Sequence, residues 1–88
     1  MSDDISQLNF GASARLYKWP SLGNARREDR APYMIAEATL DECIREFMAK
    51  PEKARHLYEI RTVPQAPLVP EILSPEHIVE LSRLRDFL

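Results

Sequence analysis

Cysteine and histidine, the residues that most often act as metal ligands or nucleophiles, are few in this chain and widely spaced. Cys43 is the only cysteine, and His56 and His77 are the only histidines. Zinc sites normally take two of their ligands from one short turn, and no such pair occurs here. The sequence also shows no nucleophile beside a base, no paired catalytic carboxylates and no phosphate-binding loop. We therefore expect no metal site, no cofactor and no enzymatic activity.

The side chains best suited to protein recognition are aromatic and basic groups near the N-terminus. Trp19 is the only tryptophan, and it lies close to Tyr17 in a segment with few local packing partners. Tryptophan and tyrosine are common anchors of protein interfaces, and arginines contact acidic partner surfaces. We predict six partner-binding residues here: Phe10, Tyr17, Trp19, Arg26, Arg27 and Arg30. Two alternatives stay open: Trp19 caps the core of its own chain, or the mixed-charge run 26–30 is a solvated face.

A second candidate site lies in the proline-rich segment. Pro64, Pro67 and Pro70 recur every three residues, which is the repeat of a polyproline II helix. With Arg61 before them, they resemble the basic-x-x-Pro-x-x-Pro ligands of Src-homology-type aromatic grooves. Arg61, Pro64 and Pro67 are therefore predicted as a secondary partner-binding site. The alternative is a stiff spacer that packs against the neighbouring helices.

Composition limits the possible classes of protein. The chain has 88 residues and a formal net charge of −2, so it fits one small domain and offers no positive field to nucleic acid. A single cysteine excludes an internal disulfide, which fits a reducing compartment. No basic start leads into an apolar run, and no stretch nears the roughly 20 apolar residues of a membrane span. We expect neither export nor membrane insertion, and the predicted location is the cytoplasm.

The clearest structural signal is a capping box formed by Thr39 and Glu42. Behind it, apolar residues fall on one stripe at helical spacing and predict a helix of about 40–50. Cys43 lies beside that stripe, which is typical of a buried structural thiol rather than a nucleophile. Pro51 ends the helix, because its ring clashes with the preceding turn.

Two further helices complete the predicted domain. Residues 52–61 begin with good helix formers, although the apolar run 56–63 also suits a strand. Ser74 and Pro75 provide an N-cap and a first-turn proline, which together begin a helix over 75–87.

These elements predict a mainly α fold, a small three-helix domain of residues 33–88 that contains an extended proline-rich connector at 63–74. Residues 1–32 are expected to form an extended or disordered arm that is largely irregular. The alternative is an α+β fold with short strands near 33–37 and 56–63.

The combined features favour a non-enzymatic protein–protein interaction module, a small adaptor or accessory subunit. It would dock through the aromatic N-terminal arm and an amphipathic helix face. Its core is marginal alone, so the expected partner is another protein or a homo-oligomer. The alternative function is a small nucleic-acid-binding regulator, which the acidic balance disfavours.

Overall fold

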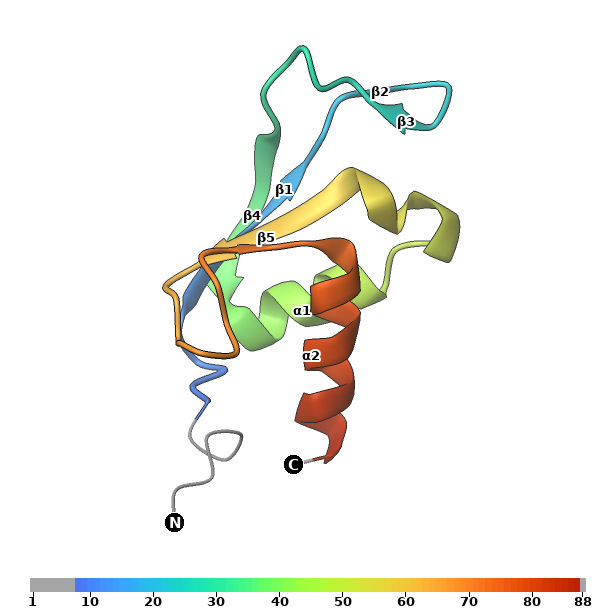
Figure 1. The fold of residues 1–88 in the computed structure, drawn as a ribbon. Helices are drawn as coiled ribbons and strands as arrows, with labels where there is room; N and C mark the ends of the chain where they lie inside the picture. The colour runs from blue at the N-terminus through green and yellow to red at the C-terminus, as the bar shows by residue number, and fades with distance from the viewer. Residues whose placement is uncertain (1–7, 88) are drawn as a thin grey trace.

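The computed structural model describes residues 8–87 and shows a four-stranded antiparallel sheet with two helices on one of its faces (Figure 1). The strand order is β4-β1-β5-β6, and a separate two-stranded ribbon pairs β2 with β3. In chain order the elements are β1 (Ser13–Lys18), β2 (Ser21–Leu22), β3 (Ala25–Arg26), β4 (Tyr33–Thr39), α1 (Leu40–Met48), the 3₁₀ helix η2 (Glu52–Leu57), β5 (Tyr58–Thr62), β6 (Ile72–Leu73) and α2 (Pro75–Phe87).

β1 is the inner strand around which the sheet is built. It pairs antiparallel with β4 on one side and with β5 on the other. Its side chains alternate, so Ala14 and Leu16 are buried while Ser13 and Arg15 are exposed. This period of two is typical of a strand with one covered face. The two helices therefore cover the face that carries Leu16.

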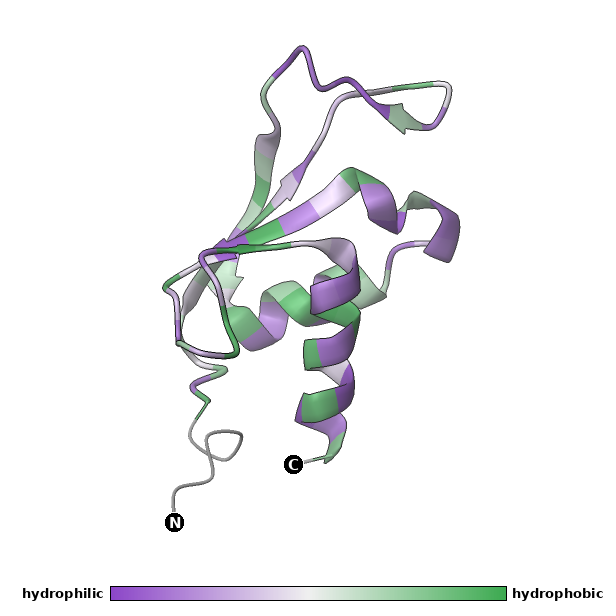
Figure 2. Cartoon of the chain, in the orientation of Figure 1, coloured by the Kyte–Doolittle hydropathy of each residue, from purple (hydrophilic) through white to green (hydrophobic). Residues whose placement is uncertain are grey.

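The core lies between that face of the sheet and the two helices. Figure 2 shows apolar and polar residues alternating along both helices, as expected for elements with one covered side. The largest fully buried side chains are Leu16 and Ile60 from the sheet, Leu40, Ile44 and Phe47 from α1, Leu73 from β6 and Ile78 from α2. Burial of such side chains is the main favourable term in folding, so this single layer carries most of the stability.

The connection from β1 to β4 is a flap formed by the β2–β3 ribbon. Its turn residues Gly23 and Asn24 both have φ of 61°, the left-handed geometry of a tight hairpin turn. The flap lies against η2, where Arg26 Nε donates to the His56 carbonyl at 2.5 Å. His56 Nε2 hydrogen-bonds in turn to the Asn24 carbonyl at 2.6 Å. These contacts fasten the flap to the domain.

The prediction of a mainly α, helical fold is wrong, because the protein is α+β. The predicted helix 52–61 ends after Leu57: its first part is η2 and the rest is β5. The prediction of a largely irregular arm at residues 1–32 is wrong for residues 13–18, which form the inner strand β1, and residues 1–7 of that arm lie outside the described residues. β5 pairs with β1 along its whole length, and this ladder outweighs local helix propensity. The observed strands β4 and β5 lie where the α+β alternative placed them.

The proline-rich connector is also not the extended rod that was predicted. The Gln65 N–H donates to the Val69 carbonyl at 2.7 Å, and the Val69 N–H donates to the Gln65 carbonyl at 3.0 Å. These two bonds close a loop. The Gln65 side chain bonds to Asn9 through both of its polar atoms, at 2.8 and 2.9 Å. Pro64 and Pro67 are exposed on this loop. The structure therefore does not give them the extended geometry of a polyproline ligand.

The two α-helices lie close to their predicted positions. α1 covers most of the predicted range 40–50, and α2 spans 75–87. The capping box is confirmed: the Thr39 hydroxyl accepts the Glu42 amide at 3.1 Å, and the Glu42 carboxylate accepts the Thr39 amide at 3.2 Å. Local signals of this kind predict a helix start well, because both partners lie within one turn.

Candidate functional site

The candidate site is the free edge of β4, an outer strand of the sheet. β4 pairs with β1 on one side, and no residue between 8 and 87 pairs with its other side. The Leu40 amide donates to the Ala12 carbonyl at 2.7 Å. Because bonded and non-bonded pairs alternate along an antiparallel ladder, Ala38 and Ala36 also direct their backbone groups at β1. The amide and carbonyl of Glu37, between them, therefore point to the open edge.

The first half of β4 exposes a run of apolar side chains. Tyr33, Met34 and Ile35 are 49%, 49% and 40% exposed. Ile35 has no partner residue, because the register with β1 shifts between Leu16 and Tyr17 and leaves a β-bulge in β4. Bulges occur often at sheet edges, where they re-aim side chains. Here Ile35 faces the helix side of the sheet and lines a groove.

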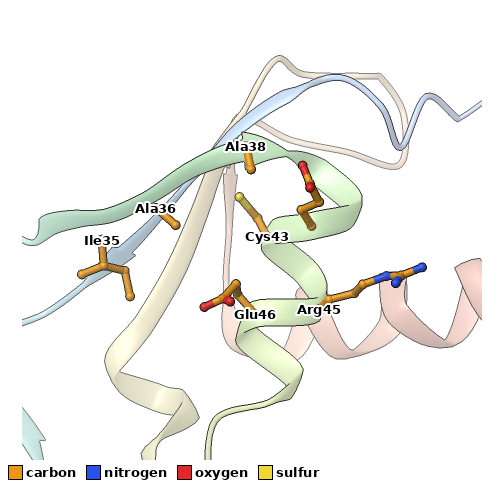
Figure 3. A pocket seen from close by; sticks show the side chains of 7 residues that line it. Ile35, Ala36, Ala38, Cys43, Arg45 and Glu46 are labelled. Atoms are coloured by element: carbon orange, nitrogen blue, oxygen red, sulfur yellow. The ribbon is translucent and has the colours of Figure 1, made fainter.

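This groove, of about 600 Å³, lies between the second half of β4 and α1. Ala36, Ala38 and Cys43 line it, and Figure 3 shows Cys43 pointing from α1 toward Ala38. The Cys43 side chain is fully buried, and burial raises the pKa of its thiol to about 11. A protonated thiol is a poor nucleophile at neutral pH. The small residues therefore shape the groove, and the thiol contributes packing rather than reactivity.

The rim of the groove carries charges of both signs. Glu42, Arg45 and Glu46 line it from α1. Arg45 Nε lies 3.1 Å from Asp41 Oδ2, yet the Arg45 side chain remains 71% exposed. Figure 3 shows Arg45 and Glu46 extending from α1 in different directions. These exposed charges are therefore accessible to a second surface.

The opposite edge of the sheet differs from β4. β6 has two residues and lies between Pro70 and Pro75. Short strands and prolines are common devices that prevent pairing at a sheet edge. β4 has seven residues, includes neither proline nor lysine, and carries one charged residue, Glu37. Within residues 8–87, the sheet thus has one protected edge and one open edge.

The aromatic residues predicted to bind a partner are held by contacts within the chain. Trp19 is partly buried, and its Nε1–H donates to Glu59 Oε1 at 3.0 Å. Arg61 Nε donates to the other Glu59 oxygen at 2.8 Å, and its guanidinium lies 4.5 Å from the centroid of the Tyr17 ring. Arg26 lies 5.3 Å from the Trp19 ring centroid. Glu59 is 6% exposed, and these bonds satisfy a carboxylate that would be costly to bury alone.

The other predicted residues are not brought together into one site. Phe10 packs against the hydrophobic core. Arg27 forms an ion pair with Asp29 at 2.8 Å, and Arg30 is exposed in the segment that leads to β4. Phe10 therefore lies against the core, whereas the Arg27 amide donates to the Pro20 carbonyl at 2.6 Å, next to Trp19.

Sequence reasoning missed Glu59 and the groove residues Ala36 and Ala38. The available signal for Glu59 was an acidic residue between Tyr58 and Ile60 in a run that suits a strand. The two alanines alternate with a charged residue, which is the pattern of a strand with one covered face. Both signals become clear only once the strand assignment is known.

Metal binding, membrane insertion and similarity to known proteins were considered as well. Across residues 8–87, no group of three or more histidine, cysteine, aspartate or glutamate residues is placed to hold a metal ion. Within that same range, no helix has the length and apolar character needed to cross a membrane. Comparison with protein-family models, curated proteins and solved structures gave no match.

Proposed function

We propose that the protein is a non-enzymatic protein–protein interaction module, a small adaptor or accessory subunit, which binds a strand of a polypeptide along the free edge of β4. The observation that carries this proposal is one open edge that combines the free backbone groups of Glu37 with the exposed apolar run 33–35. Strand addition obtains affinity from main-chain hydrogen bonds and specificity from neighbouring side-chain pockets. The groove beside β4 is such a pocket.

Two features support an interface at this edge. Isolated exposed apolar residues are normal, but a contiguous run beside a groove is typical of a binding surface. Tyr33, Met34 and Ile35 are consecutive in β4 and all exposed, and Ile35 lines the groove. We place the protein in the cytoplasm, because Cys43 is its only cysteine and a reducing compartment keeps such a thiol free.

The substitution Glu37→Pro tests the proposal directly. Proline lacks an amide hydrogen, and at position 37 it removes a donor that β1 does not use. We expect the tagged variant to retain at least about tenfold less partner protein than the wild-type chain when both are purified from the native cell. Strand addition depends on the donor that proline removes. Quantitative mass spectrometry of the co-purified proteins measures this loss.

Glu37→Ala is the matched control, because it removes the same carboxylate and keeps the amide. It should bind the partner as the wild-type chain does. Circular dichroism and Trp19 fluorescence establish that both variants are folded. Equal binding by Glu37→Pro and Glu37→Ala, or the absence of any bound strand, whether from another protein or a second copy, would contradict the proposal.

A further inference from the structure

The two halves of the open edge of β4 differ in the side chains that they offer. The first half exposes Ile35, and the second half borders the groove that Ala36 and Ala38 line. An antiparallel pair of identical strands about a two-fold axis places the first half of each beside the second half of the other. Ile35 of each copy then meets the alanine-lined groove of the other, and the same contact forms twice.

The charges beside the groove are compatible with the same symmetry. In a two-fold interface, any residue i that contacts residue j of the other copy is matched by the reverse contact. A rim of one sign would repel its own copy. Here Arg45 lies on the same rim as Glu42 and Glu46, so each copy offers both a positive charge and negative charges to the other.

Resting on the proposed function of β4 as a binding edge, we propose that its occupant is a second copy of this chain, paired β4 to β4 in antiparallel orientation. The two four-stranded sheets then join into one continuous sheet. Each groove is covered by Ile35 of the other subunit. The pairing also removes the one open edge, while β6 stays a short, proline-flanked edge on the outside of the dimer.

Ile35→Lys is the first test, measured by sedimentation velocity on the purified full-length chain from about 1 μM to about 100 μM. The wild-type chain, of 10.2 kDa, should approach twice that mass as its concentration rises. Lysine at this edge opposes pairing by placing a charge where an apolar contact forms, so the dissociation constant should rise at least about tenfold.

Ile72→Lys is the matched control for that variant. It makes the same substitution on β6, at the opposite edge of the sheet, and Ile72 is similarly exposed at 52%. Its dissociation constant should equal that of the wild-type chain. Glu37→Pro should weaken the dimer as Ile35→Lys does, through the loss of a backbone donor rather than an apolar contact.

A charge-exchange experiment tests the pairing across the two-fold axis. Arg45→Glu makes the rim wholly acidic, and the double variant Glu42→Arg, Glu46→Arg makes it wholly basic. Each should dimerise more weakly than the wild-type chain, because like charges then face each other. An equimolar mixture should form a heterodimer more tightly than either variant forms a homodimer, and native mass spectrometry distinguishes the three species.

Several results would overturn the inference. A wild-type chain that stays monomeric across the concentration range has no such dimer. A dimer that is unchanged by Ile35→Lys, or weakened equally by Ile72→Lys, assembles through another surface. A third outcome separates the two proposals. If the chain is monomeric, and Glu37→Pro abolishes binding of a different protein that Glu37→Ala still binds, the second copy is excluded while the proposed function stands.

Discussion

Cys43 and Glu59 are two buried residues whose behaviour depends on what their neighbours provide. The Cys43 thiol lies between α1 and β4 in apolar surroundings, which disfavour its ionised form. Glu59 is also buried, but Trp19 and Arg61 donate hydrogen bonds to both of its carboxylate oxygens. The surroundings of Cys43 therefore suppress thiol reactivity. The surroundings of Glu59 compensate the cost of burying its charge and fix the Trp19 side chain in place.

We predict that Cys43 is unreactive in the folded protein. Its pKa of about 11 leaves almost no thiolate at about pH 8, and its side chain is fully buried. Iodoacetamide should therefore alkylate it only after denaturant is added, as measured by the mass of the intact chain. Fast alkylation without denaturant would show that the thiol is accessible in the folded chain.

The same shift fixes the direction of a pH effect on stability. The folded pKa of about 11 lies above the ordinary value of 9.0, so the folded chain keeps its thiol proton where the unfolded chain loses it. The contribution of Cys43 to the free energy of unfolding is therefore complete below pH 9.0 and falls as the pH rises toward about 11. Cys43→Ala should show a smaller decrease over that interval in urea unfolding.

At the scale of secondary-structure elements, the boundary between β4 and α1 depends on the capping box. Thr39 is the last residue of β4 and the N-cap of α1. Its bonds with Glu42 satisfy backbone amides that a helix start would otherwise leave free. The box therefore fixes where the strand ends, and with it the length of the open edge.

We predict that Thr39→Ala lowers the free energy of unfolding by about 1 kcal/mol, because it removes the side-chain acceptor of the cap. Thr39→Ser keeps the hydroxyl and should lose much less. Urea unfolding followed by Trp19 fluorescence measures both variants. Equal loss in the two would mean that the threonine methyl group, and not the hydroxyl, stabilises this position.

The strands were harder to predict than the helices because their partners lie far away in sequence. β1 is only six residues long, and its alternating residues Ala14, Leu16 and Lys18 include two weak strand formers. Its strand geometry comes from pairing with β4 and β5 on both sides. Residues 58–62 likewise leave the helical pattern because β1 offers them a ladder.

At the scale of the whole molecule, the proposed dimer should make stability depend on concentration. Association stabilises the folded state by mass action, so the Tm of the wild-type chain should rise by several degrees as its concentration increases about a hundredfold. The Tm of Ile35→Lys should change little over the same range. Differential scanning calorimetry measures both, and a wild-type Tm independent of concentration would contradict the dimer.

The sequence by itself determined the two α-helices, the capping box at Thr39, the single free cysteine and the lack of paired metal ligands. Each of these depends on residues within about one helical turn or on composition alone. Only the tertiary structure decided that residues 13–18 are an inner strand, that Trp19 bonds to Glu59, and that β4 keeps an open edge. These features arise from pairing between segments that are distant in sequence. The energy of such pairing cannot be read from a local sequence pattern.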